Sequence, residues 1–360
     1  MRADRDVIII GAGLAGLMLA ERLALSSQRQ LRVEVFEQAP SLTTARRSWS
    51  WYEAGRPRTA FDKTWTRWEM SAANLAVARP FADGRYGLLR GEALAGRALQ
   101  AIETSPSVRL RLSASVSAIR SAPGGAVVET SQGELSARMV IDTRPGGAEL
   151  LDRARWVRTG IRAEVRTGSA CFDQDTATLV HRLRREDGAL TFETVLPLAA
   201  DHAIIEAVRI ARSGDERRPA FDRAVERITG GVAADIGIRM RSASPLGLSD
   251  RWPVSARAVR IAASRGAGLA LAGATGRDAQ RGQVWAVQAF DALERGRALP
   301  GLPAQPLLAR LSSYLLFRRL AARPSRLIAM AERSPGDSIV RLVGGTASLA
   351  DAAPLLWVNR

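Results

Sequence analysis

Residues 6–16 read DVIIIGAGLAG, an apolar β-branched run followed by three glycines with the spacing G-x-G-x-x-G. The run DVIII is typical of a strand that is buried on both faces of a parallel sheet. Leu14–Leu25 then predicts a helix, and the alternating segment Leu31–Phe36 predicts a second strand. This order of strand, glycine turn, helix and strand predicts a βαβ unit.

Each glycine of the motif has a distinct expected task. Gly11 makes the tight turn, Gly13 lets the backbone approach a pyrophosphate, and Gly16 lets the helix pack on the strand. Glu37, 21 residues after Gly16, ends the second strand, where a carboxylate suits a ribose hydroxyl. A glycine turn without a ligand is the alternative. We expect a dinucleotide site, and FAD is favoured over NAD because the chain leaves this domain after the βαβ unit and returns to it twice.

Composition limits the class of protein. The chain has 360 residues, enough for more than one domain, and its 46% hydrophobic and 24% charged residues are ordinary for a soluble globular protein. Cys171 is the only cysteine, so an intrachain disulfide is excluded. Only His181 and His202 accompany it, and we expect no metal site. We expect a cytoplasmic protein.

The formal net charge is +16, and nearly all of the positive charge is arginine. A basic surface for anionic lipid or nucleic acid is one interpretation, and a genome biased toward Arg and Ala codons is the other. The arginines are spread along the chain and aromatic residues make up only 5%, so we expect no nucleic-acid partner. No stretch reaches the roughly 20 apolar residues of a spanning helix. Leu307–Ala331 is basic and amphipathic, so it either lies peripherally on a membrane or packs on the protein as helices.

The rest of the chain divides by pattern. Residues 39–81 have no clean period and hold four of the eight tryptophans. Further helices are predicted at Gly91–Ile102, Pro219–Ile228 and Val284–Arg297, and strands at Val108–Arg120, Ala126–Thr130, Glu134–Ile141, Phe192–Leu198, Ala203–Ile210 and Ala258–Ala274.

We therefore predict an α/β protein with an FAD-binding Rossmann-like domain of the glutathione-reductase type. That domain is expected to comprise 1–40, 86–146 and 255–300. An inserted antiparallel-sheet substrate domain is expected at 41–85 and 147–254, and a C-terminal helical segment at 301–360.

Several later segments resemble the bacterial FAD-dependent lycopene β-cyclases, within the wider group of aromatic hydroxylases and geranylgeranyl reductases. Residues 47–52 (RSWSWY) look like the family's HTWSFH, and residues 140–146 (VIDTRPG) look like its VIDARG. Residues 196–198 (LPL) and 204–206 (IIE) look like its LPL followed by LIEDT, and residues 344–356 look like its closing segment G-x-x-T-x-x-D.

The chain departs from the family pattern at three points. Arg47 and Tyr52 replace both histidines of the early motif, and Ala207-Val208 replaces the Asp-Thr that follows the glutamate. These positions concern the substrate more than the FAD. A monooxygenase, a halogenase or a prenyl reductase of the same fold is therefore one alternative, although no Ile-Pro follows the halogenase-like Trp49-Ser-Trp51. A flavin-binding protein that has lost catalysis is another.

Glu206 is the candidate catalytic residue. Alternation along Ala203–Ile210 places it on one face with Ile204, Val208 and Ile210, so we predict a poorly solvated carboxyl with a raised pKa. A protonated acid in an apolar cavity suits the protonation of an alkene. An exposed glutamate at a sheet edge is the alternative. The resemblance implies acid attack on a terminal double bond of an isoprenoid polyene, then ring closure and proton loss, which is the reaction of an isomerase.

Reduced FAD is expected to stabilise the carbocation without being consumed, with NAD(P)H as the reductant. The expected cofactor-binding residues are Gly11, Ala12, Gly13, Leu14, Ala15, Gly16, Glu37, Arg90, Asp142, Gly273 and Gly282. Trp49, Trp51, Tyr52 and His202 are expected to line the substrate site, and ordinary core packing is an equal alternative for the three aromatic residues.

Overall fold

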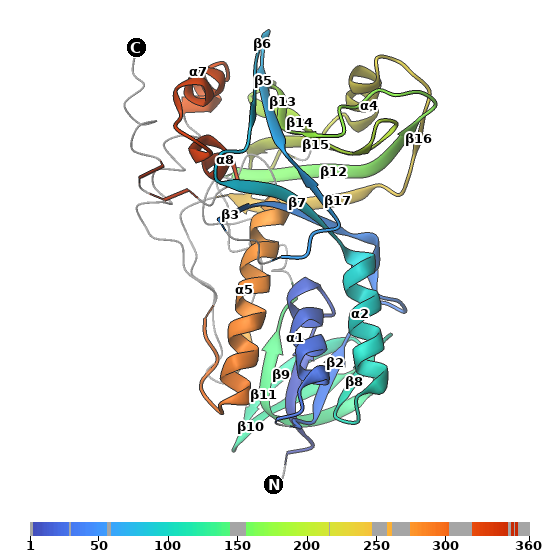
Figure 1. The fold of residues 1–360 in the computed structure, drawn as a ribbon. Coiled ribbons are helices and arrows are strands. Elements are labelled where there is room, and N and C mark those ends of the chain that lie inside the picture. The colour runs from blue at the N-terminus through green and yellow to red at the C-terminus, as the bar shows by residue number, and fades with distance from the viewer. Residues whose placement is uncertain are drawn as a thin grey trace.

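The computed structural model describes residues 3–28, 30–55, 59–144, 156–215, 217–246, 258–260, 274–301, 319–344, 347–348 and 350–351. These residues form three sheets and the helices that cover them. One sheet lies with α1, α2 and α5 at the end of the molecule near the N-terminus, and the largest sheet lies at the opposite end (Figure 1).

The first sheet has the strand order β8-β2-β1-β11-β10-β9, and β18 also pairs with β11. The strands β8, β2, β1, β11 and β18 are parallel, whereas β10 and β9 continue the sheet as an antiparallel meander. Their bounds are β1 Arg5–Ile10, β2 Val33–Phe36, β8 Val108–Arg111, β9 Val116–Ala122, β10 Gly125–Thr130, β11 Gly133–Asp142 and β18 Ala258–Arg260.

The apolar run of β1 is buried on both faces. Val7 and Ile9 pack in the core beneath α1 (Leu14–Leu25), α2 (Gly91–Thr104) and α5 (Ala274–Glu294). Ile8 and Ile10 pack in a second core with residues of β10 and β11. Full burial of each such side chain contributes about 1.5–3 kcal/mol, which explains why an unbroken apolar run is found here and not an alternating one.

The largest sheet has the order β16-β12-β15-β14-β13-β5-β6, and β17 pairs with β12. All pairs are antiparallel except β13 with β5. The bounds are β5 Arg67–Ala72, β6 Leu75–Pro80, β12 Trp156–Thr167, β13 Thr176–Glu186, β14 Ala189–Ala199, β15 His202–Arg212, β16 Ala234–Ile236 and β17 Met240–Leu246.

The two faces of the largest sheet have different covers. Helix α4 (Phe221–Thr229) packs on one face. The other face shares a core with residues of a three-stranded sheet, β3-β7-β4, and of two helices near the C-terminus. Their bounds are β3 Ser48–Ala54, β4 Lys63–Trp65, β7 Gly84–Arg90, α7 Arg326–Arg333 and α8 Ser338–Val343. The strand β7 leads directly into α2, so the small sheet joins the two ends of the molecule.

Several predicted elements change. The single strand predicted at Val108–Arg120 is two strands, β8 and β9, separated by a turn in which Ser113 has φ +53°. Helix α5 begins at Ala274 and not at Val284. It therefore also includes the polar residues and the two glycines that precede Val284. Of the strand predicted at Ala258–Ala274, β18 takes the first three residues, and 261–273, including Gly273, lie outside the described residues.

The predicted amphipathic segment 307–331 is described only from residue 319 onward. Helix α7 begins at Arg326, just after Pro324. Leu320, Leu327 and Ile328 are buried in the core next to the largest sheet. In this part of the segment the apolar side chains therefore pack on the protein, as the second interpretation predicts.

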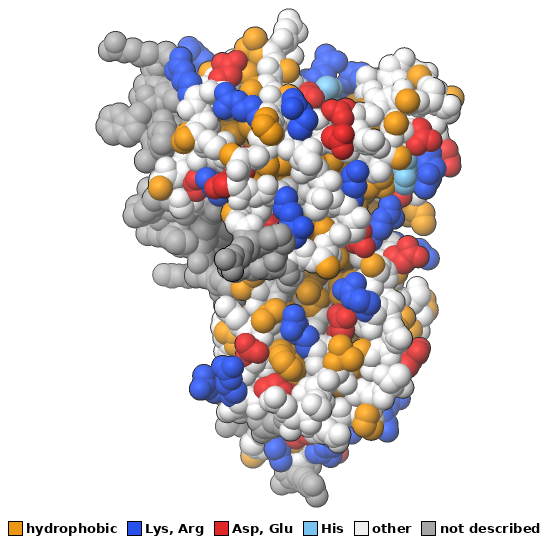
Figure 2. All heavy atoms as spheres, in the orientation of Figure 1, with side chains coloured by type: hydrophobic (Ala, Val, Ile, Leu, Met, Phe, Trp, Pro, Cys, Tyr) orange, Lys and Arg blue, Asp and Glu red, His pale blue; other side chains and the backbone are white. Residues whose placement is uncertain are grey.

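Among the described residues no helix has both the length and the apolar character needed to cross a membrane. On the face drawn in Figure 2, basic and acidic side chains are interspersed. This face therefore shows no single large basic patch.

Candidate functional site

The glycine turn after β1 has the geometry that its sequence predicts. Gly11 has φ +97°, and a Cβ at Gly16 would lie 2.1 Å from the carbonyl oxygen of Gly11. Both positions are closed to side chains by backbone conformation or by packing. A Cβ at Gly13 would meet no atom of the described residues within 4 Å, so these residues leave the space in front of the first turn of α1 open. That combination fits a pyrophosphate approaching the backbone.

The first turn of α1 has free backbone amides that could bind an anion. Gly13 is the N-cap and provides no side-chain hydrogen bond to the helix. Glu37 accepts hydrogen bonds from the amides of Ala12 (3.0 Å) and Ala39 (3.1 Å), which fixes its carboxylate beside the turn. Uncapped amides and the positive end of the helix dipole favour a phosphate at this position. The residues present therefore fit a dinucleotide.

Asp142 holds a turn at the end of β11. Its buried carboxylate receives a bidentate pair from Arg144, with both N–O distances 2.9 Å. Arg144 also donates to the carbonyl of Val116 on β9. Next to Asp142, the Thr143 hydroxyl lies within hydrogen-bond distance of the carbonyl oxygens of Ile10 and Gly11. Asp142, Thr143 and Arg144 at the end of β11 thus stabilise the glycine turn that follows β1.

Gly282 lies where α5 crosses the first turn of α1. A Cβ at this position would come within 3.4 Å of the Ala15 Cβ and 3.5 Å of the Leu14 Cδ2. These distances are ordinary van der Waals contacts, so α5 packs directly on the start of α1 and an alanine would also fit at position 282. Among the expected cofactor residues, only Gly273 lies outside the described part of the chain.

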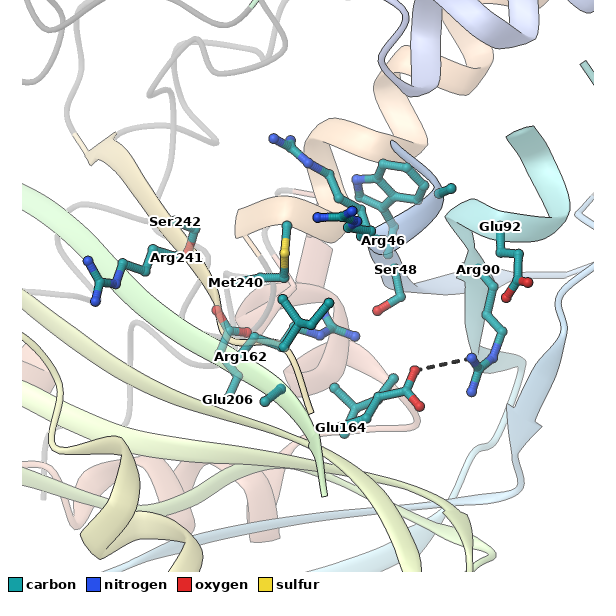
Figure 3. A pocket seen from close by; sticks show the side chains of 16 residues that line it. Arg46, Ser48, Arg90, Glu92, Arg162, Glu164, Glu206, Met240, Arg241 and Ser242 are labelled. Carbon is teal, nitrogen blue, oxygen red and sulfur yellow. Dashed lines mark ion pairs between the residues drawn. The ribbon is translucent and has the colours of Figure 1, made fainter. Parts of the chain in front are cut away.

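A cavity of about 360 Å³ lies between η1 (Thr43–Arg46), β3, the start of α2 and the edge of the largest sheet. The volume is within the range of small-molecule sites, about 300–1,000 Å³. The Thr44 hydroxyl donates to the Ala12 carbonyl (2.6 Å), which ties the cavity wall to the glycine turn. The lining residues are Ala45, Arg46, Arg47, Ser48, Trp49, Arg90, Glu92, Arg162, Ala163, Glu164, Ile204, Glu206, Ile238, Met240, Arg241 and Ser242 (Figure 3).

Glu206 lies in the wall of this cavity and is only 4% exposed. The predicted alternation along β15 is confirmed, because Ile204, Val208 and Ile210 belong to the core on its own side. Ala203, Ile205 and Ala207 belong to the core on the opposite side. Directly across the ladder, Arg162 of β12 is the register partner of Glu206.

The predicted rise in the pKa of Glu206 is wrong. Burial, the largest single influence, raises the pKa, but the charges of Arg158 and Arg162 outweigh it and hold the pKa below its usual value. Arg158, which is 1% exposed, donates from Nη1 to Glu206 Oε1 at 3.1 Å. The carboxylate form is therefore stabilised by guanidinium groups from a neighbouring strand.

Gly160 makes this ion pair possible. A Cβ at Gly160 would lie 2.5 Å from Glu206 Oε1 and 2.8 Å from Ser242 Oγ. With a side chain at position 160, the carboxylate of Glu206 would have to move from its place beside Arg158. We call Arg158, Arg162 and Glu206 the charge cluster. Burial raises the pKa of Tyr86, whose neutral phenol lies within the electrostatic reach of all three members.

A second set of polar contacts, centred on Glu164, lies at the edge of the cavity. Glu164 of β12 pairs with Arg90 (Nη1–Oε1, 3.1 Å) and with His202 (Nε2–Oε2, 3.0 Å). The dashed line in Figure 3 marks the pair between Arg90 and Glu164. Burial lowers the pKa of His202, which favours the neutral ring. Two of the expected site residues, Arg90 and His202, thus meet at Glu164.

The expected aromatic wall is only partly present. Trp49 lines the cavity. Trp51 instead packs edge-on against Phe61, with ring centroids 4.8 Å apart, and Tyr52 lies in the core beside the largest sheet. The Tyr52 oxygen is 2.7 Å from Asp83 and 2.8 Å from Asp337, so it joins the β6–β7 turn to α8.

The residues that sequence reasoning missed are mainly on β12. Arg158, Gly160, Arg162 and Glu164 recur at every second position of Trp156–Thr167 and share one face. This alternation is visible in the sequence and could have indicated a polar inner face. Arg46 and Ser48, on the opposite wall in Figure 3, carried no signal of their own.

The fold and the site define an α/β protein of the FAD-binding Rossmann type, with an antiparallel sheet beside the dinucleotide end. A family model described as lycopene cyclase protein matches residues 6–242, more than half of the chain. The chain therefore belongs to the lycopene cyclase family. No curated protein matches the sequence.

Solved structures share the fold at low sequence identity. A geranylgeranyl bacteriochlorophyll reductase-like protein from Thermoplasma acidophilum is 13% identical with a TM-score of 0.60, covering 98% of this chain and 95% of that chain. The flavin-dependent brominase Bmp2 is 12% identical with a TM-score of 0.58, covering 98% and 97%. The halogenase PltM, solved with phloroglucinol and FAD, is 13% identical with a TM-score of 0.53, covering 94% and 78%.

Replacing Glu206 with glutamine should remove a pH-dependent part of the stability. Its folded pKa lies below the ordinary value of 4.5, so the ionised group stabilises the fold above pH 4.5, and this contribution is lost as the pH falls through the folded pKa. Glu206→Gln also leaves Arg158 buried without a counter-charge, so we expect the free energy of unfolding at pH 7 to fall by about 3–5 kcal/mol. Denaturant unfolding at a series of pH values measures both effects.

The control is Glu92→Gln, because Glu92 lines the same cavity but is exposed. This variant should lie within about 0.5 kcal/mol of the wild type. Equal losses in the two variants would contradict the assigned ion pair.

Tyr52→Phe should lower stability and leave ligand binding intact. Removing the hydroxyl breaks its contacts with Asp83 and Asp337, which keep Arg341 and backbone amides as partners, so the cost should be about 0.5–1.5 kcal/mol. Thermal unfolding and ligand titration measure the two properties, with Trp49→Phe as the comparison at the cavity wall. Weaker ligand binding by Tyr52→Phe at unchanged stability would place Tyr52 in the site after all.

Proposed function

We propose that this protein is an FAD-dependent enzyme that closes a ring at the end of an isoprenoid chain without net oxidation. Membership of the lycopene cyclase family supports this reaction class. The observation that carries the proposal is the position of Glu206, a buried carboxylate in a cavity whose opposite wall is tied to the glycine turn.

The proposed cofactor is FAD, held at the first turn of α1. The open space at Gly13, the uncapped helix and the fixed carboxylate of Glu37 fit its pyrophosphate and ribose. The halogenase PltM, which shares the fold, is described in complex with FAD. In the reduced form, supplied by NAD(P)H, FAD provides negative charge close to a developing cation.

The proposed work of Glu206 is proton transfer. Ring closure adds a proton to a terminal double bond, forms one carbon–carbon bond and releases a proton from a neighbouring carbon, so substrate and product have the same atoms. The protonated form of Glu206, which becomes more populated as the pH falls, supplies the first proton, and the resulting carboxylate accepts the last one. Between these steps the carboxylate stabilises the cation through its negative charge.

Other residues near Glu206 position its carboxylate, stabilise the cation and contact the chain of the substrate. Arg158 fixes the position of the carboxylate and keeps its pKa low, so the protonated form becomes more populated as the pH falls. The ring of Trp49 can stabilise a cation through its face. Ile204 and Met240 offer apolar contact to the isoprenoid chain and exclude water from the reacting end.

A redox reaction of the same fold, catalysed by a monooxygenase, a halogenase or a prenyl reductase, is the second candidate. The polarity of the cavity favours it, because arginine side chains line much of its wall and a hydrocarbon forms no hydrogen bonds with them. The arginines are Arg46, Arg47, Arg90, Arg162 and Arg241. The two candidates differ in whether the reductant is consumed in proportion to the product.

Turnover by reduced, FAD-loaded enzyme tests the proposal. With lycopene and with shorter isoprenoids, the product should have the mass of the substrate, and no net NAD(P)H should be used. Glu206→Gln should lower turnover by about 10²–10⁴-fold. In Arg158→Met the pKa of Glu206 should rise, so the pH range of activity should extend upward. Reductant use in proportion to product, or full activity of Glu206→Gln, would reject the proposal.

Gly13→Val should abolish FAD binding without unfolding the protein. Gly13 has φ −77°, a conformation open to any residue, and the added side chain would occupy the space meant for the pyrophosphate. Visible absorbance of the purified protein measures bound flavin. Gly96→Val is the matched control, because a Cβ at Gly96 on α2 also meets nothing within 4 Å. Retention of FAD by Gly13→Val would contradict the assigned site.

A further inference from the structure

The charge cluster contains two guanidinium groups and one carboxylate. Nη1 of Arg158 is used by Glu206, but Nε and Nη2 of Arg158 and of Arg162 are buried and have no hydrogen-bond partner among the described residues. Arg162 also lines the cavity. The site therefore holds one positive charge and several N–H donors that the described part of the protein does not satisfy.

Such an arrangement is costly in the absence of a ligand. Each buried donor left without an acceptor costs about 1–3 kcal/mol, and an uncompensated buried charge costs more. Burial lowers the pKa of Arg162, as expected where the charged form is poorly solvated. An anion bound in the cavity would compensate the charge of Arg162, whose side chain is partly exposed there.

The other acidic side chains of the cavity do not supply this anion. Glu164 already pairs with Arg90 and His202. Glu92 is exposed at the start of α2. Within the described chain, no carboxylate of the cavity is therefore left to compensate the charge of Arg162, and an anion bound in the cavity would do so.

We propose that the substrate carries an oxyanion group, a carboxylate or a phosphate ester, which Arg162 binds in the cavity. A planar guanidinium group donates two parallel N–H bonds to either group, and a neutral polyene offers no acceptor. Arg158 remains engaged with Glu206, so the two arginines have separate partners. The isoprenoid nature of the remaining part of the substrate rests on the proposed function.

Binding to oxidised, FAD-loaded protein tests this inference. Farnesoic acid, farnesol and farnesyl diphosphate share one chain and differ in the end group, and quenching of tryptophan fluorescence, to which Trp49 in the cavity wall contributes, measures their dissociation constants. At least one anionic compound should bind at least tenfold more tightly than farnesol. The comparison of acid with diphosphate identifies which oxyanion the site prefers.

Arg162→Gln should remove this preference, so that the anionic compounds and farnesol bind with similar dissociation constants. Arg166→Gln is the matched control, because Arg166 lies on the same strand but is exposed and outside the cavity lining. Equal affinity of the wild-type protein for all three compounds would overturn the inference. The inference would also be overturned if Arg162→Gln kept the preference for anionic compounds while the reduction potential of the bound flavin fell. In that case the positive charge of Arg162 would act on the flavin and not on the substrate.

The two proposals fail in different ways. Arg162-dependent binding of an anionic isoprenoid without ring closure would support the substrate class and reject the cyclase. Ring closure of lycopene by a protein that binds no anionic compound would support the cyclase and reject the substrate class.

Discussion

The ion pair between Arg158 and Glu206, buried between two strands of the largest sheet, determines the properties of the candidate site. It requires a glycine at position 160, since a side chain there would occupy the space of the carboxylate. It keeps Glu206 ionised despite burial, because two guanidinium groups outweigh the loss of water. Beside this pair, Arg162 lines the cavity, and its Nε and Nη2 have no hydrogen-bond partner among the described residues. The charge cluster therefore determines both the ionisation of the Glu206 carboxylate and part of the polarity of the cavity.

The cavity depends on both ends of the molecule. The short helix η1 links the glycine turn to the cavity. The hydroxyl of Thr44 donates a hydrogen bond to the carbonyl of Ala12 in the turn, and Arg46 and Arg47, which follow Thr44 in the chain, line the cavity. From the other side, β7 ends at Arg90, which pairs with Glu164 of the largest sheet and begins α2 of the dinucleotide end. A ligand at the glycine turn and a ligand at the charge cluster would therefore be held by elements that contact each other directly.

Local patterns predicted the dinucleotide end well and the charge cluster poorly. Helix α1 has the predicted bounds Leu14–Leu25, and the three glycines have the predicted surroundings, because turn geometry and apolar periodicity act over a few residues. Alternation also placed Glu206 on its correct face. Its pKa was predicted in the wrong direction because Arg158 and Arg162 come from a strand more than 40 residues earlier in the chain, and register across a sheet cannot be read from one strand. Tyr52 likewise finds Asp337 at the far end of the chain.

A crystal structure of the FAD-loaded protein would test the central claim most directly, namely that the glycine turn and the charge cluster serve one active site. The account predicts the pyrophosphate at the open face of Gly13 and the isoalloxazine ring in contact with the cavity that contains Glu206 and Trp49. An isoalloxazine ring directed away from that cavity, or FAD bound elsewhere on the chain, would contradict it.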